Sequence, residues 1–276
     1  MEYLQKRIVY KSRADVFSLW FLGDLHLGSA SCDEAAIVET VKHIKADPRA
    51  LWVGVGDLGE FIPRQDWRAR QTQLASWLRG EEDEKDYEDD LVAKELDVIA
   101  DKLHPIAKKC LGLVRGNHED KHLTTFGRNV QRDICKRLQV DNLTDEAWIR
   151  VLFNRCEEDG HTQTLDLYCH HGWFSGRKSG GKVNNLHDLL GRWNADIVAV
   201  GHGHERVIAP PLITERVNRA GNLEEWRRYS LMTGSFMRTH EAGKTSYASG
   251  KGFAPNDIGA VCIEFVPDKN RLEARV

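Results

Sequence analysis

Five short clusters of aspartate, asparagine and histidine occur along this sequence, and divalent metal ions accept all three side chains as ligands. In chain order the clusters are Gly23-Asp24-Leu25-His26, Gly54-Val55-Gly56-Asp57, Gly116-Asn117-His118-Glu119, Cys169-His170-His171-Gly172 and Gly201-His202-Gly203-His204. Each cluster alone is a weak signal, because turns and helix caps use the same residues. Six of the twelve histidines lie in these clusters, however, and core packing alone does not explain that concentration. The clusters therefore predict a metal site.

The position of a cluster matters more than its spacing. Asp24 and His26 follow an apolar run and lie two residues apart, so on an extended chain their side chains project to the same side. Asp120 and His122 have the same spacing inside a helical pattern, where side chains two residues apart diverge. We therefore treat the first pair as a candidate ligand pair and the second as a decoy.

Each of the five clusters comes directly after a short apolar run that is typical of a buried strand. These runs are Val16–Leu22, Leu51–Val55, Cys110–Val114, Leu165–Cys169 and Ile197–Val200. Helical spacing of apolar residues predicts helices at Glu34–Ala46, Asp66–Arg79, Leu91–Lys109, Lys121–Leu138 and Leu186–Trp193. Since ligands of such α/β folds collect at the carboxyl ends of the strands, we expect the five clusters to meet at one edge.

The pattern changes after His204 to strands and turns. The best runs are Arg206–Ile213, Tyr229–Phe236 and Ile258–Val266. They indicate a second sheet that completes a sandwich. No internal repeat or Pro- or Gly-rich linker interrupts the chain, so we expect residues 1–276 to form one domain.

Composition narrows the class of protein. The 276 residues carry a net charge of −3, which is not the basic footprint of a protein that binds nucleic acid through its whole surface. The N-terminus lacks a secretory pattern, and the longest apolar run, Val16–Leu22, is too short to cross a bilayer. Six scattered cysteines fit reduced thiols, so we expect a cytoplasmic location without membrane contact. The acidic run 81–90 is interpreted as a solvated segment.

The ordered set Asp-x-His, Gly-Asp, Gly-Asn-His-Glu, His-x-Gly and Gly-His-x-His resembles the calcineurin-like metallophosphoesterases, a superfamily of phosphatases, phosphodiesterases and nucleases. The match runs from Asp24 to His204. It implies a four-layer α/β/β/α metallophosphoesterase sandwich with a dinuclear metal site at the carboxyl ends of the strands. From Gln163 to His204 the chain is also similar to phosphoesterases of phage and prophage genomes. Leu58-Gly59-Glu60 departs from the Ser/Thr phosphatase pattern, which disfavours that subclass.

The resemblance also implies roles for individual residues. One metal ion would be held by Asp24, His26 and His204, and the other by Asn117, His170 and His202, with Asp57 bridging the two. His118 would be catalytic, protonating the leaving oxygen or stabilising charge in the transition state. The expected cofactors are two divalent ions, with manganese ahead of iron, zinc and nickel. No cysteine in the set imposes a thiolate site.

Two of these assignments remain ambiguous at the level of sequence. His170 and His171 are adjacent at a strand end and point to opposite sides, so only one of them should reach the metals. His170 is chosen because it directly follows the apolar run, and His171 is assigned to substrate binding. Arg177, Lys178 and Lys182 are also assigned there, since the glycine-rich segment that carries them could cover a phosphate. A solvated loop explains that segment equally well.

The function predicted from these features is hydrolysis of a phosphate monoester or diester by a dinuclear metal centre and a metal-activated water. The expected partner is a phosphate-ester substrate, with a nucleotide or nucleic acid among the candidates. A manganese-dependent nuclease of the break-repair type is the first alternative, disfavoured by the net charge. A non-catalytic metal-binding scaffold, as in some relatives of membrane-traffic complexes, is the second. The sequence does not indicate the oligomeric state.

Overall fold

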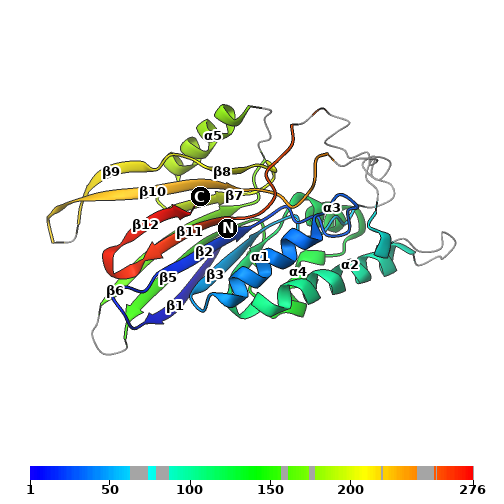
Figure 1. Cartoon of the computed structure of the whole chain (residues 1–276), viewed down its shortest axis with the longest axis horizontal. Helices are drawn as coiled ribbons and strands as arrows, with labels where there is room; N and C mark the ends of the chain where they lie inside the picture. The colour runs from blue at the N-terminus through cyan, green and yellow to red at the C-terminus, as the bar shows by residue number, and fades with distance from the viewer. Residues whose placement is uncertain are drawn as a thin grey trace.

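Apolar runs that end at the five clusters form strands of two sheets in the computed structural model of this chain. The structure describes residues 1–62, 74–78, 87–156, 161–173, 178–218, 220–240, 252 and 254–275. Within these residues the two sheets face each other, with helices on the outer side of each (Figure 1). The expected α/β sandwich with layers in the order α/β/β/α is confirmed.

The first sheet has five strands and carries the first three clusters. Its order is β12 (Arg271–Arg275), β11 (Val261–Val266), β2 (Phe17–Leu22), β3 (Ala50–Val55) and β4 (Cys110–Val114). Strands β2, β3 and β4 run parallel, so their carboxyl ends lie at one edge. Asp24, Asp57 and Asn117 therefore follow neighbouring strand ends.

The second sheet has seven strands and carries the other two clusters. Its order is β1 (Glu2–Tyr10), β5 (Glu146–Arg155), β6 (Thr162–His170), β7 (Ile197–Val200), β10 (Leu223–Thr233) and β8 (Arg206–Ile208), with β9 (Leu212–Val217) pairing with β10. Strands β6 and β7 are parallel neighbours, so the histidines that follow them also share one edge. Figure 1 shows the β9–β10 hairpin extending beyond the rest of the sheet.

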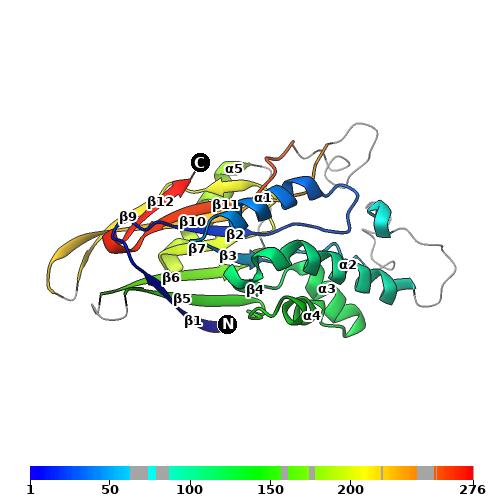
Figure 2. The same ribbon diagram turned by 60° about the horizontal axis from the view of Figure 1, so that its bottom comes forward.

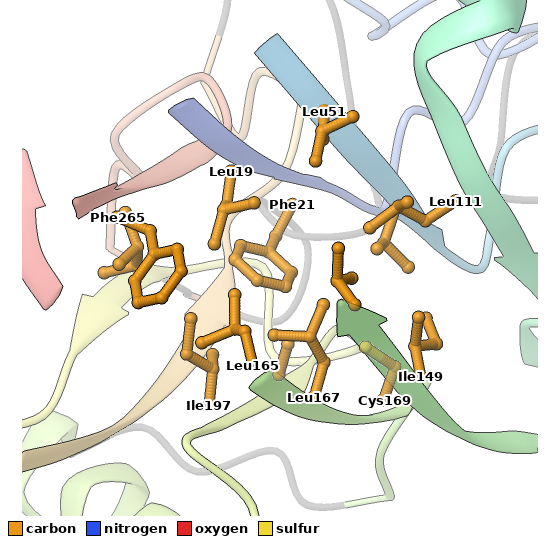
Figure 3. Packing of buried hydrophobic residues seen from close by; sticks show 14 of the residues in the cluster. Leu19, Phe21, Leu51, Leu111, Ile149, Leu165, Leu167, Cys169, Ile197 and Phe265 are labelled. Atoms are coloured by element: carbon orange, nitrogen blue, oxygen red, sulfur yellow. The ribbon is translucent and has the colours of Figure 1, made fainter. Parts of the chain in front are cut away.

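The main core lies between the sheets (Figure 3). Leu19 and Phe21 of β2 face Leu165 and Leu167 of β6, and all four side chains are 0–1% exposed. Burying an apolar side chain of this size stabilises the fold by about 1.5–3 kcal/mol relative to exposure. The core thus holds the two sheets together, so that the carboxyl ends of their parallel strands lie at the same edge.

Helices cover the outer faces of the two sheets. The five-stranded sheet is covered by α1 (Glu34–Ala46), α2 (Tyr87–Leu103), α4 (Val130–Leu138) and the 3₁₀ turn η3 (His104–Lys109). Helix α3 (Asn117–Phe126) packs on α4, and the 3₁₀ turn η2 (Ser76–Leu78) packs on α2. Helix α5 (Ser179–Arg192) packs on β7 and β10 of the other sheet. Figure 2 shows α2, α3 and α4 grouped together, and Figure 1 shows α5 on the opposite side of the two sheets from α1 to α4. A further 3₁₀ turn, η4 (Pro267–Lys269), precedes β12.

Capping groups set several helix boundaries. The Asp33 carboxylate accepts the Ala36 N–H at the start of α1, and the Asn129 side chain accepts the Arg132 N–H at the start of α4. Gly127 adopts a left-handed conformation, with φ of 70°, and ends α3. The prediction of a single helix at Lys121–Leu138 is therefore wrong, because α3 ends at Phe126 and a separate helix, α4, begins at Val130.

Three other expectations differ from the structure. Arg206–Ile213 is split between β8 and β9 instead of forming one strand. The helix expected at Asp66–Arg79 lies largely outside the described residues, which show only a 3₁₀ turn at Ser76–Leu78. The acidic run also lies mostly outside them, and α2 begins at Tyr87. None of the helices in the described part of the chain is both long and apolar enough to cross a membrane.

Candidate metal centre

The five clusters meet at one edge of the sandwich, where the carboxyl ends of β2, β3 and β4 lie next to those of β6 and β7. Backbone hydrogen bonds join the loops: Asp24 N–H donates to Gly56 O at 3.0 Å, and Gly201 N–H donates to His171 O at 2.9 Å. The His202 N–H donates to the Asp24 carboxylate at 2.9 Å and so connects the two sheets. A Cβ added at Gly56 would lie 2.5 Å from His171 Nδ1, so only glycine permits this close approach.

Five of the candidate ligands adopt a left-handed backbone conformation that is uncommon for residues other than glycine. They are Asp24, His26, Asp57, His202 and His204, with φ between 46° and 65°. Such conformations persist only where the surroundings enforce them, and they concentrate at functional sites. Their presence in three different loops singles out this edge of the sandwich as the candidate site.

The first group of ligand atoms comes from Asp24, His26 and His204, and these atoms lie within 4.8 Å of one another. His204 Nε2 is 3.2 Å from Asp24 Oδ1, and His26 Nε2 is 3.2 Å from His204 Nε2. All three are expected ligands of one metal ion, and the structure brings them together.

The second group contains Asn117, His171 and His202. The Asn117 Oδ1 atom lies 3.0 Å from His171 Nε2 and 2.8 Å from His202 Nδ1. Two imidazole nitrogens and an amide oxygen suit borderline divalent ions. Asn117 and His202 are expected ligands, whereas His171 occupies the place that the sequence assigned to His170.

Asp57 lies between the two groups. Its Oδ2 atom is 4.0 Å from His26 Nε2 on one side and 3.1 Å from His171 Nε2 on the other. Its Oδ1 atom accepts the backbone N–H of His118 at 2.9 Å, which fixes the orientation of the carboxylate. Asp57 is 1% exposed, so the carboxylate can contact both groups but almost no solvent.

Hydrogen bonds on the far side of the imidazoles fit a metal-binding role. His26 Nδ1 donates to the Glu60 carboxylate at 3.0 Å, and His171 Nδ1 donates to the Val55 carbonyl at 2.8 Å. With Nδ1 held in this way, the Nε2 atom of each ring is directed into the cluster, where a metal ion could take the place of a proton. The residues present therefore fit two divalent cations.

The electrostatics of the cluster also favour cations. Burial alone would raise the pKa of Asp57, but the His171 and His118 imidazoles hold it well below its usual value. Burial likewise opposes ionisation of Asp24, but His204 lowers its pKa. Burial would lower the pKa of His171, yet Asp57 and Asp24 raise it to about 10. The two carboxylates thus remain charged and attract positive charge.

His170 is placed away from the ligand atoms, so its choice over His171 is wrong. Cys169 points into the core between the sheets, and the next residue of β6 therefore points to the opposite face. There the His170 ring lies edge-on to Trp173, and its Nδ1 accepts the Gly172 N–H at 2.6 Å. None of the ligand groups among the described residues contains His170.

His118 adjoins both Asp57 and His26. Its ring is 4.6 Å from the His26 ring between centroids, and its Nδ1 donates to the Glu60 carbonyl at 2.5 Å. A nitrogen of this ring lies within 4.8 Å of the ligand atoms of His26 and Asp57. The side chain is buried at the site, in the position required of either a proton donor or a ligand.

The cations assigned to substrate binding have different placements. The Lys182 ammonium donates to Gly203 O at 2.9 Å and to the Glu205 carboxylate at 2.6 Å, so its assignment to a free phosphate-binding loop is wrong. Lys178 is exposed just before α5. Arg177 lies outside the described residues.

Two buried glutamates that support the site were not assigned from the sequence. Glu60 receives protons of both His26 and His118, through its carboxylate and its carbonyl. Glu119 accepts the N–H groups of Asp57, Leu58 and Gly116 at 2.8–3.0 Å. The spacing of Gly116 and Glu119 at a helix start is that of a capping box and was the available signal for the second.

No protein-family model matches this sequence, and no curated protein matches it either. Among solved structures, the chain is similar to a conserved uncharacterized protein of Streptococcus pneumoniae TIGR4, described as a predicted phosphoesterase, with 10% identity, a TM-score of 0.36 and coverage of 91% of this chain and 84% of that one. It is also similar to a Zn²⁺ complex of Vps29 from Entamoeba histolytica, with 12% identity, a TM-score of 0.39 and coverage of 94% and 97%.

A third similar structure is the calcineurin-like phosphoesterase YfkN from Bacillus subtilis, with 13% identity, a TM-score of 0.29 and coverage of 70% of this chain and 63% of that one. The two-sheet α/β/β/α fold is the one that the sequence resemblance to the calcineurin-like metallophosphoesterases implies.

Proposed function

We propose that this protein is a metal-dependent hydrolase of phosphate esters with a dinuclear centre. The observation that carries the proposal is the position of Asp57, whose Oδ2 lies 3.1 Å from His171 Nε2 and 4.0 Å from His26 Nε2. A carboxylate between two groups of carboxylate, imidazole and amide donors is suited to bridge two cations. Paired cations are one means by which proteins hydrolyse phosphate esters without a covalent intermediate.

The residues divide into two ligand sets that share Asp57. Asp24, His26 and His204 form the first set, and Asn117, His171 and His202 form the second. Two divalent ions bound there would acidify a water molecule and neutralise charge on the phosphoryl oxygens. The protein contributes fixed ligand directions, because Glu60 and Val55 O hold the far nitrogens of His26 and His171.

His118 is proposed as the proton donor to the leaving oxygen. The Glu60 carbonyl accepts the Nδ1 proton, so Nε2 is the atom that exchanges a proton with the ester. The backbone N–H of His118 binds Asp57 Oδ1, which holds the ring beside the bridging position. These contacts support a role of the His118 side chain in general acid catalysis, which requires a proton donor beside the reacting group.

Manganese is the proposed metal, with iron, zinc or nickel as alternatives, because the donors are carboxylate, imidazole and amide. We propose a small or nucleotide-like phosphate ester as the substrate. The net charge of −3 supports this class over long nucleic acid, whose binding depends on many cationic contacts.

The proposal is tested by preparing the metal-free protein and adding back each metal ion singly. Metal content is measured by elemental analysis, and turnover is measured with an aryl phosphate monoester and an aryl phosphate diester. We expect two metal ions per chain and metal-dependent hydrolysis. Two bound ions without turnover of either ester would favour a scaffold, and no bound metal would overturn the proposal.

Asp57→Asn and Asp120→Asn form a matched pair for this test. Asp57→Asn removes the shared charge and should weaken metal binding by more than the roughly 10–100-fold that is typical of a change behind the ligands, with a comparable loss of turnover. The Asp120 carboxylate is exposed on α3, 3.5 Å from Arg115, and its replacement should leave both measurements unchanged. Equal effects of the two changes would show that Asp57 does not bridge the metals.

A further inference from the structure

Helix α5 is connected to the loop that carries two of the candidate ligands. The Lys182 ammonium donates to the carbonyl of Gly203 at 2.9 Å and to Glu205 Oε2 at 2.6 Å. The other carboxylate oxygen of Glu205 accepts the Ser179 hydroxyl at 2.6 Å. Lys182 is 7% exposed, so its charge is withdrawn from solvent and matched by Glu205.

The carbonyl that Lys182 binds belongs to the residue between His202 and His204. Both histidines adopt left-handed backbone conformations, with φ of 65° and 52°, and the loop forms no helix or strand. Its shape therefore depends on individual contacts. A Cβ on Gly203 would lie 2.1 Å from Met232 Sδ, so this residue is pressed against β10 on one side and held by Lys182 through its carbonyl.

A buried lysine can stabilise a helix without affecting a functional site, so it matters which residues accept its hydrogen bonds. Here both acceptors lie on the ligand loop, one between the two histidines and one directly after the second. His202 contacts Asn117 of the second ligand set, and His204 contacts Asp24 of the first. A shift of this loop would therefore move one imidazole away from each metal position at once.

We propose that Lys182 and Glu205 are positioning residues that hold His202 and His204 at the two metal positions, so that α5 sets the affinity for both ions. The proposal rests on the proposed function, because it requires that these histidines bind metal. Lys182 is buried and Glu205 is partly buried, so removing one member of this ion pair leaves the other without its partner and disfavours the original arrangement. Changes in such outer contacts typically weaken metal binding 10–100-fold.

The test is calorimetric titration of Mn²⁺ into the metal-free full-length protein, for the parent and for Lys182→Met. We expect both binding steps to weaken by about 10–100-fold in the variant. In a parallel assay, the Mn²⁺ concentration that gives half-maximal hydrolysis should rise, while the plateau at excess Mn²⁺ stays within a few-fold of the parent. A lysine that only stabilised the fold would lower the melting temperature without moving this midpoint.

Matched variants distinguish a loss of histidine positioning from a general loss of folding stability. Lys182→Arg keeps the charge and its hydrogen bonds and should restore part of the affinity. Arg192→Met removes an exposed cation from the other end of the same helix and should leave Mn²⁺ affinity unchanged. Should Lys182→Met fail to fold, Glu205→Gln provides the same test, because it removes the charge that pairs with Lys182.

The two proposals fail in different ways. A parent protein that binds no Mn²⁺ would overturn the proposed function and the inference with it. A parent that binds two ions and hydrolyses esters, with Lys182→Met and Glu205→Gln binding Mn²⁺ as tightly as Arg192→Met, would overturn only the positioning role of α5.

Discussion

The carboxylate of Glu119 binds the backbone of Asp57, with 3.0 Å between Oε2 and the Asp57 nitrogen. The same oxygen accepts the Gly116 N–H at 2.9 Å, and the other oxygen accepts the Leu58 N–H at 2.8 Å. Glu119 is fully buried at the start of α3. One side chain therefore joins the loop of Asp57 to the loop that carries Asn117 and His118.

Glu119→Gln should destabilise the protein, because the amide NH₂ of glutamine would face backbone N–H groups that now have acceptors. An unsatisfied buried donor costs about 1–3 kcal/mol, and we expect a loss of this size in the free energy of unfolding. Urea unfolding measures it. Glu215→Gln on the exposed face of β9 is the control. Equal stability of the two variants would mean that Glu119 does not hold these loops.

His170→Ala and His171→Ala should have opposite consequences for metal binding. His171 directs Nε2 toward Asn117 and Asp57, whereas the His170 ring lies against Trp173. We expect His171→Ala to lose one of two bound ions in elemental analysis and His170→Ala to keep both. Loss of a metal ion from His170→Ala alone would restore the assignment made from the sequence.

Glu95 gives a pH dependence of stability that can be isolated. Its Oε1 atom accepts the N–H groups of Glu60 and Phe61 at 3.0 and 3.1 Å, and burial raises the pKa of this carboxyl to about 8. The unfolded chain releases the proton near pH 4.5, the ordinary value. Between these two pH values the folded state binds more protons, so its stability falls as pH rises.

Glu95→Gln cannot ionise and should lack this decline. Urea unfolding at about pH 5.5 and about pH 8.5 should show a larger loss of stability in the parent than in the variant. Other buried groups titrate in both proteins, so the difference between the two isolates Glu95. The same decline in the variant would show that Glu95 is ionised throughout this range in the folded protein.

Strands that are buried on both faces could be located from the sequence. The run Cys110–Val114 is a strand with the expected bounds, and so is Ile197–Val200, because each is continuously apolar and stops at a polar cluster. Strands β1 and β5 were not predicted. Positions in β5 alternate between buried and partly exposed, and most positions in β1 alternate between partly exposed and exposed, which dilutes the apolar signal that marks the other strands.

The sequence predicted the kind of site, a cluster of metal ligands, but it did not identify every residue of that cluster. Asp24, His26 and Asp57 follow strands whose ends are clear in the sequence, and the structure places them together. The choice between His170 and His171 depended on which residue ends β6 and on which face Cys169 occupies, and both are set by pairing with neighbouring strands. The contacts of Lys182 could not be predicted either, because they join α5 to a loop 21 residues further along the chain.

His118→Asn separates metal binding from proton transfer. If His118 is the general acid, all seven proposed ligands remain, so elemental analysis should still find two metal ions per chain. Turnover should fall by roughly 10²–10⁴-fold, the usual contribution of general acid catalysis. The loss should be smallest for a nitrophenyl ester, whose leaving group needs little protonation, and largest for an alkyl ester. The ring also lies within 4.8 Å of His26 and Asp57 ligand atoms, so loss of a metal ion would identify His118 as a ligand instead. An equal loss for both esters, with both ions retained, would assign His118 to positioning the phosphate.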